Sequence, residues 1–168
     1  MSTSQRPTEG GRRPEQESSV RRVITTMTEL SLVGTWRLVS FFTPDGNGGM
    51  RDYWSDQPLG QLIYTPDGRV SAQVYDRRRP RLETAWERAN ASAAQVAFTA
   101  MASYYGTYRI DAAHHTVTHI VEGAMSPDWI GTKLVRGYRF VGPDRIELRV
   151  PAADESTNGE AVLIWDRI

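Results

Sequence analysis

Residues 32–42, LVGTWRLVSFF, begin the part of the chain that can form a folded core. In this stretch Gly34 stands two positions before Trp36, and large apolar residues then alternate with small or polar ones. Alternation with a period of two predicts a β-strand, because successive side chains of a strand point to opposite faces. We therefore expect the fold to open with a strand over residues 34–43, entered through a sharp turn that a glycine permits.

The same kind of pattern recurs along the rest of the chain. Period-two alternation, or enrichment in β-branched and aromatic residues, predicts eight strands, at residues 34–43, 60–66, 69–76, 104–111, 115–122, 132–141, 144–151 and 160–168. Short turns such as TPDGR at 65–69 join them, and connections this short require antiparallel hairpins. The sequence thus predicts an all-β fold whose eight strands close into an antiparallel up-and-down barrel, because closure removes both sheet edges.

One segment interrupts the strands. Residues 92–102, SAAQVAFTAMA, are good helix formers, and their spacing gives an apolar stripe that includes Phe98 and Met101. Ser92, with Gln95 three residues later, predicts a capping box at the start of this helix. We expect one short helix between strands 3 and 4, either packed on the core or covering one end of the barrel.

The beginning of the chain has a different composition. Residues 1–22 combine Pro, Gly, Ser, Gln and charged residues with little that a core would bury, which is typical of disorder. We predict a disordered tail over residues 1–30 and a single barrel domain over residues 31–168, and Met27 is an alternative start. No signal peptide is evident, and no stretch approaches the ~20 apolar residues of a membrane span, so we expect a cytoplasmic protein without membrane contact.

Composition narrows the classes of partner. Lys plus Arg and Asp plus Glu number 20 each, so the net charge of zero gives no reason to expect nucleic acid. The arginines of residues 77–81 stand beside glutamates and are interpreted as a solvated loop. The absence of cysteine excludes thiolate metal sites and cysteine nucleophiles. We expect no metal and no cofactor, and we leave the oligomeric state open, with a homodimer as one alternative.

Four blocks of the sequence together resemble the bacterial lipocalin-like domain family, whose members are calycin-type β-barrels. The blocks are GTWRLVSF, GQLIYTPDGRVSAQV, YYGTYRIDAAHHTVTHIVEGAMSPDWIGT and AVLIWDRI, and they cover most of residues 32–168. The resemblance implies a barrel with an apolar central cavity, opened by a Gly-x-Trp motif at 34–36. It also implies that Arg167, near the last strand, covers Trp36 through a cation–π contact. Relatives of this fold are ligand carriers or cofactor-free cyclases.

Alternation also predicts which polar residues enter the barrel. His119 shares a face with Val117 and Val121, so it is expected inside, and Gly106 is expected to leave space beside it. The same reasoning selects four candidate catalytic residues: Tyr108, His119, Arg136 and Tyr138. A neutral histidine can act as general acid or base, and an arginine with a tyrosine hydroxyl can stabilise an enolate. The alternative is a structural network in which these buried groups only satisfy one another.

The expected ligand is a small hydrophobic molecule. Its candidate contacts are aromatic or apolar side chains of the inner wall, the rim and the helix: Tyr64, Tyr104, Trp129, Phe140, Phe98 and Met101. We hypothesise cofactor-independent cyclisation or isomerisation of a polyketide- or terpenoid-like molecule in natural-product biosynthesis. The alternative function is a non-catalytic carrier of such a ligand.

Overall fold

The structure is a computed structural model, and it describes residues 30–151 and 160–168. Strands dominate it, as the sequence predicts. They are β1 (Gly34–Pro44), β2 (Met50–Asp52), β3 (Pro58–Tyr64), β4 (Arg69–Asp76), β5 (Met101–Asp111), β6 (Thr116–Ala124), β7 (Lys133–Gly142), β8 (Arg145–Val150) and β9 (Ala161–Arg167). The tail predicted over residues 1–30 lies, except for Leu30, outside the described residues.

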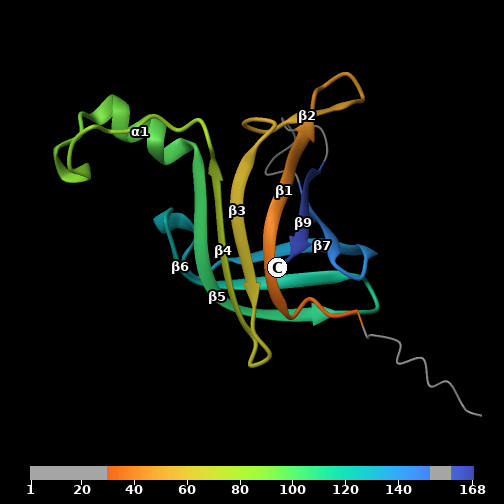
Figure 1. Ribbon diagram of the computed structural model, residues 1–168. Helices are drawn as coiled ribbons and strands as arrows, with labels where there is room; N and C mark the ends of the chain where they lie inside the picture. Colours follow the sequence, from red (N-terminus) through yellow and green to blue (C-terminus); the bar gives the residue numbers. More distant parts are fainter. Residues whose placement is uncertain (1–29, 152–159) are drawn as a thin grey trace, which may run out of the picture.

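Eight of these strands form a closed antiparallel barrel. Hydrogen-bonded neighbours follow the order β1-β3-β4-β5-β6-β7-β8-β9, and β9 pairs back onto β1. In Figure 1 the strands β1, β3 and β4 stand upright while β6 and β7 run across the view, so opposite walls of the barrel cross at a steep angle. The predicted all-β class and the antiparallel up-and-down barrel are thereby confirmed.

The ninth strand, β2, is a local addition that the sequence pattern misses. It pairs only with the far end of β1, opposite residues 42–44. All three of its residues are exposed, so it carries no alternation of buried and exposed positions. Asp45 builds the turn before it, because its carboxylate accepts hydrogen bonds from the backbone N–H groups of Asn47 (2.7 Å) and Gly49 (2.9 Å).

The predicted place of the helix, between strands 3 and 4, is wrong. The helix α1 (Ala91–Thr99) lies between β4 and β5, because β2 precedes β3 in the chain order. It begins after Asn90, whose side-chain oxygen accepts the N–H of Ala93 at 2.8 Å, and so the predicted capping box at Ser92 does not start it.

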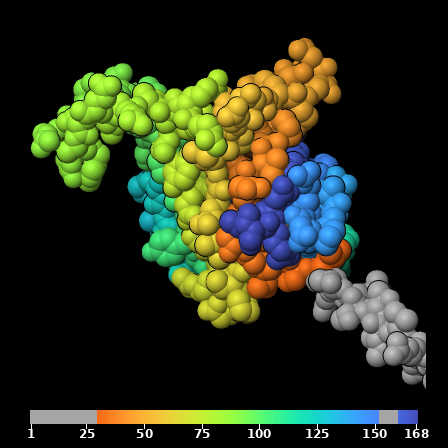
Figure 2. Space-filling model, in the orientation of Figure 1, coloured from red at the N-terminus to blue at the C-terminus, as the bar shows by residue number. Residues whose placement is uncertain are grey.

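The helix also does not pack on the core. No residue of α1 is buried, and Phe98 is 47% exposed. Figures 1 and 2 show α1 and the loop before it projecting from the barrel, beyond the upper ends of β4 and β5. Of the residues in its predicted stripe, α1 contains only Ala94, Ala97 and Phe98, and the two alanines offer little apolar area to bury. Within the described residues, no helix is long and apolar enough to cross a membrane.

The Gly-x-Trp motif closes the barrel at its other end. Trp36 is fully buried, and its indole N–H donates to the carbonyl of Leu32 at 2.8 Å. The Arg167 guanidinium lies 4.0 Å from the centre of the Trp36 ring, which confirms the predicted cation–π contact. The same guanidinium donates to the carbonyls of Val33 (2.8 Å) and Ser31 (2.7 Å), so it ties the entry of β1 to the end of β9.

Gly34 is required by both the backbone and the space around it. Its φ of +145° is unfavourable for any residue with a Cβ, and a Cβ built there would come within 2.3 Å of the Arg167 guanidinium. The turn that begins β1 and the arginine that covers Trp36 therefore need the same glycine. The glycine of the Gly-x-Trp motif is thus explained by the close approach of the Arg167 guanidinium to the Gly34 backbone at this end of the barrel.

The core consists of the inward-facing side chains of the barrel wall. Burying this apolar surface supplies the main driving force for folding. Its buried members are Leu32, Trp36, Leu38, Leu62, Tyr64, Val70, Ala72, Val74, Val117, Ile146, Leu148, Leu163 and Trp165.

Gly106 has a structural role that differs from the predicted one. It is buried at a β-bulge between β5 and β6. A Cβ on it would lie 1.9 Å from the backbone oxygen of Ile120. The missing side chain therefore lets two strands approach each other and does not open space for a ligand.

Candidate functional site

A buried histidine with two tyrosine partners lies inside the barrel. His119 projects inward from β6 and is only 1% exposed. Its Nε2 lies 2.7 Å from the hydroxyl of Tyr64, and its Nδ1 lies 2.8 Å from the hydroxyl of Tyr104. Both ring nitrogens are thus hydrogen-bonded to phenol groups, in a wall that is otherwise mostly apolar.

Three strands bring this group together. Tyr64 is the last residue of β3, and Tyr104 lies near the start of β5. The pairing of β5 with β6 sets Tyr108 directly opposite His119, and Tyr104 faces the same side as Tyr108 because four positions separate them. The Tyr64 ring packs edge-on against Tyr108, with centroids 4.8 Å apart, and this contact holds its hydroxyl beside the imidazole.

The surroundings keep the histidine neutral. Burial, together with the smaller effect of the positive charge of Arg136, lowers the pKa of His119 to about 3. Burial also raises the pKa of Tyr64 well above its usual value, so this phenol keeps its proton. Burial raises the pKa of Tyr104 as well, although the charge of Arg136 and hydrogen bonding from its guanidinium oppose that rise.

Of the four predicted catalytic residues, Arg136 influences His119 through its positive charge. His119 is in the interior, and Arg136 faces the same cluster from β7, where Arg136 pairs with Val117. Tyr108 lies beside His119, but its hydroxyl donates to the backbone oxygen of Thr65 at 2.9 Å. Tyr138 stands apart from the cluster, with its ring against His115 and Phe140.

The predicted ligand contacts divide in a similar way. Tyr64 and Tyr104 hydrogen-bond to His119, and Trp129 stands edge-on to Tyr104 with centroids 6.1 Å apart. Phe140 packs against the core beside Tyr138. Met101 is half-buried at the start of β5, where its sulfur accepts a hydrogen bond from Arg79 at 3.4 Å, and Phe98 projects on α1. A ligand-binding role for these residues stays a prediction.

Two features of the site escape sequence reasoning. Tyr64 and Tyr104 are predicted as ligand contacts, and the structure shows that they are also the hydrogen-bond partners of His119. This partnership depends on the registers of the four strands β3 to β6. Trp165 also faces the interior, and its buried indole nitrogen has no hydrogen-bond partner within the described residues. Its position two residues after Leu163 on one face of β9 is the signal that could have found it.

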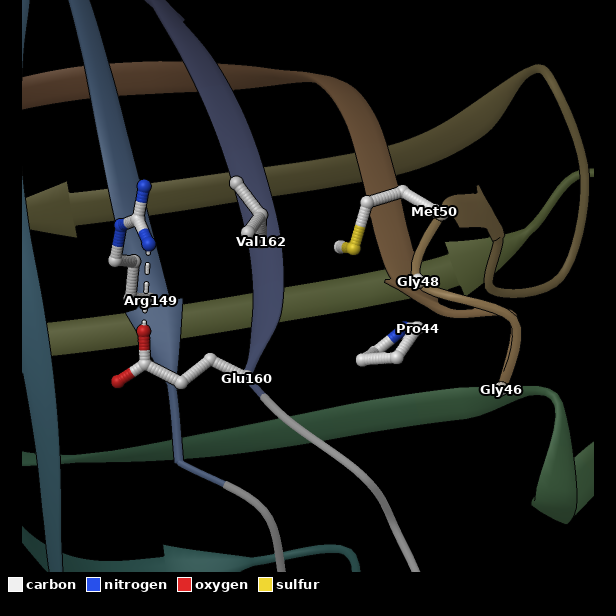
Figure 3. A pocket seen from close by; sticks show the side chains of 8 residues that line it. Pro44, Gly46, Gly48, Met50, Arg149, Glu160 and Val162 are labelled. Carbon is white, nitrogen blue, oxygen red and sulfur yellow. Dashed lines mark hydrogen bonds and ion pairs between the residues drawn. The ribbon is translucent and has the colours of Figure 1, made fainter.

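Other hollows lie away from His119. Figure 3 shows one pocket, between the β1–β2 hairpin and the adjoining ends of β8 and β9, where the side chains of Arg149 and Glu160 face each other. The volume of this pocket is about 590 Å³, and the two side chains are 3.5 Å apart. Arg149 alternates with the buried Leu148, so this pocket lies on the outer wall. A second pocket of about 620 Å³ includes Tyr138 and Phe140 in its lining.

No group of three or more His, Asp or Glu side chains in residues 30–151 and 160–168 is arranged to hold a metal ion. In a comparison with known families, the model of the lipocalin-like domain family matches residues 33–168. No curated protein matches the chain.

Proposed function

The chain belongs to the lipocalin-like domain family, and on that premise we propose that its barrel binds a small, uncharged and largely apolar molecule in its interior. A barrel of about eight strands is wide enough to hold one small ligand. One observation carries the proposal: His119 and two tyrosine hydroxyls form a polar cluster in an interior that is otherwise lined mostly by apolar side chains. Small-molecule sites are typically apolar walls with a few polar groups that orient the ligand.

Binding without chemistry is the function that the electrostatics favour. A histidine whose pKa is about 3 is a weak base near neutral pH. Its two nitrogens are moreover already engaged by Tyr64 and Tyr104. Since general-base catalysis works best when the pKa of the base lies near the working pH, His119 is better suited to holding hydroxyl groups in place than to abstracting a proton.

The experiment uses N-phenyl-1-naphthylamine, an uncharged fluorescent probe of apolar sites. Ala102 and Ser103 are neighbours on β5, and Ala102 packs against the core whereas Ser103 occupies the opposite face. We expect Ala102→Leu to weaken probe binding at least severalfold by occupying interior space. The matched variant Ser103→Leu should bind normally. Equal affinities in two folded variants, judged by thermal unfolding, would place the bound probe outside the barrel and contradict the proposal.

One observation favours a second candidate, cofactor-independent isomerisation. The Arg136 charge acts on both Tyr64 and Tyr104, and phenol donors next to a fixed positive charge suit an enolate-like transition state. In this version the tyrosines and Arg136 stabilise the enolate, and His119 positions the tyrosines. A hydroxide ion from the solvent takes the α-proton of the ligand, and water returns a proton to the carbon that receives it. The cyclase activity and the biosynthetic role expected from the sequence belong to this same proposal.

Hydrogen–deuterium exchange at the methyl group of 2-acetylnaphthalene tests it. We expect the protein in D₂O to accelerate exchange over buffer, and Arg136→Met to remove most of the acceleration. A wild-type rate equal to that in buffer, for a ketone shown to be bound, would leave the carrier function alone.

A further inference from the structure

The cluster of His119, Tyr64 and Tyr104 has more donor hydrogens than its hydrogen-bonded contacts use. A neutral imidazole has one N–H donor and one bare nitrogen, and each tyrosine adds one O–H, so the cluster has three hydrogens. Its two contacts, at 2.7 and 2.8 Å, use only two of them. Within the described residues, His119 is the partner of both hydroxyls in these contacts. One tyrosine hydrogen therefore remains available to another acceptor in the interior.

The position of Arg136 selects which hydroxyl is free. Arg136 acts on the Tyr104 oxygen, and a guanidinium can only donate. We therefore assign this oxygen as an acceptor toward Arg136 and place the Tyr104 hydrogen on the contact with Nδ1 of His119. The imidazole then carries its proton on Nε2 and donates it to Tyr64. The chain of donors runs from Arg136 through Tyr104 and His119 to Tyr64. Among the residues that the structure describes, this leaves the O–H of the buried Tyr64 without an acceptor.

A second free donor faces the same interior from β9. Trp165 is 2% exposed, and its cross-strand neighbours Leu38 and Ile146 are both buried, so its side chain lies on the inner face. No acceptor for its indole nitrogen exists among the residues that the structure describes. An indole N–H can only donate. Buried donors normally have partners, and two without one in a single interior indicate that the partners belong to a bound molecule.

We infer that the ligand is a hydrogen-bond acceptor, a ketone, quinone or ester, whose oxygen accepts the hydroxyl hydrogen of Tyr64, with a second acceptor atom meeting the indole N–H of Trp165. This inference rests on the proposed function, because it names the class of molecule that the barrel interior takes. An alcohol or amine offers a further donor to a site that already has a surplus of donors. A hydrocarbon of the same shape leaves both donors unsatisfied, so the site discriminates against it.

The first experiment compares two probes of nearly equal shape. These are 2-acetylnaphthalene, which has a carbonyl oxygen, and 2-isopropylnaphthalene, which has none. Isothermal titration of wild-type protein should show the ketone binding about tenfold more tightly, the size expected for a net hydrogen bond in a buried site. The infrared C=O stretch of the bound ketone should lie below its frequency in cyclohexane, because a donated hydrogen bond weakens the carbonyl bond.

The variants then assign the donors. Tyr64→Phe should reduce the ketone preference and move the C=O stretch toward its cyclohexane value. Tyr105→Phe is the matched control, since this neighbouring tyrosine is 53% exposed and lies on the outer face of β5. Trp165→Phe removes the indole donor, and for 1,4-naphthoquinone, which has two acceptors, we expect a further loss of affinity of about fivefold.

The outcomes separate the inference from the proposed function. If both naphthalenes bind equally and the carbonyl stretch matches cyclohexane, the interior binds apolar molecules but the inference is overturned. If neither probe binds, the proposed function fails and the inference fails with it. Equal carbonyl frequencies in wild type and Tyr64→Phe overturn the choice of Tyr64 as donor.

A measurement on the free protein keeps the assignment testable even where a variant folds poorly. The ¹⁵N chemical shifts of the His119 ring distinguish its protonated from its bare nitrogen. We expect the proton on Nε2. A proton on Nδ1 instead would make Tyr104 the free donor and would contradict the proposed order of hydrogen-bond donors. Protons on both nitrogens at neutral pH would contradict the count of three hydrogens in the cluster.

Discussion

The buried histidine makes the stability of the barrel depend on pH in a way that can be calculated. In the unfolded chain a histidine titrates near pH 6.5, whereas burial lowers the pKa of His119 in the folded barrel to about 3. Between these values the unfolded chain binds one proton more than the folded protein does. The free energy of unfolding therefore rises with pH across this window. The contribution of His119 to it is fully present above pH 6.5 and is lost as the pH falls toward 3.

The magnitude follows from the width of the window. Each pH unit inside it is worth about 1.4 kcal/mol, so lowering the pH from 7 to 4.5 should cost the folded state about 3 kcal/mol through His119 alone. The charged or titratable groups that face the imidazole are Tyr64, Tyr104, Tyr108 and Arg136. None of these types of side chain titrates between pH 4.5 and 7, so the imidazole is the group in this cluster that changes charge there.

Urea unfolding followed by tryptophan fluorescence, at pH 7 and pH 4.5, measures this effect. His119→Gln keeps a neutral donor and acceptor but cannot titrate. Between pH 7 and pH 4.5, its free energy of unfolding should therefore decrease by about 3 kcal/mol less than that of the wild type. His115→Asn is the control, because His115 is exposed and its φ of +51° suits asparagine. Carboxylates such as Glu147 contribute equally to all three proteins. A pH-dependent loss that is the same in wild type and His119→Gln would refute the reasoning.

The closed end of the barrel and its bulge give three further predictions. Arg167→Leu removes the cation–π contact with Trp36 and two charged hydrogen bonds. The free energy of unfolding in urea should therefore fall by about 2 kcal/mol. An unchanged urea midpoint would show that the guanidinium contributes nothing to stability. Gly34→Ala should destabilise the fold by about 2 kcal/mol or more through its φ and its clash, whereas Gly142→Ala, where a Cβ meets nothing within 4 Å, should be nearly neutral by the same assay. Gly106→Ala should cost more than either, because the obstacle is the backbone of β6, and a cooperative thermal transition near that of wild type would contradict this.

The sequence predicts the barrel well because period-two alternation and turn chemistry act locally. The eight long strands are found within a few residues of their predicted bounds, and the Arg167 contact follows from the family resemblance. The short strand β2 depends on the carboxylate of Asp45 and on pairing with β1, which no local pattern of three exposed residues indicates. The exposed position of α1 is missed for a related reason, since an apolar stripe does not specify the surface against which it packs.

Inside the barrel, alternation predicts which side chains point inward but not which ones meet. From their strands alone, the predicted interior residues are His119, Arg136, Tyr104 and Tyr108. The partnership of Tyr64 with His119 joins residues 55 positions apart and depends on the registers of four strands. Gly106 is misread for the same reason: its missing side chain accommodates a backbone oxygen on another strand, a contact that appears only once the bulge is placed.

The seam between β1 and β9 has a consequence for synthesis of the protein. The guanidinium that seals it bonds to a carbonyl 134 positions earlier in the chain. While ribosomes translate the intervening segments, the edge of β1 that later pairs with β9 remains unpaired. Neighbouring nascent chains on a polysome expose this same edge to one another. The barrel can close only after β9 has emerged from the exit tunnel, so the interval before its release is when mispairing between chains, and protection by chaperones, matter most.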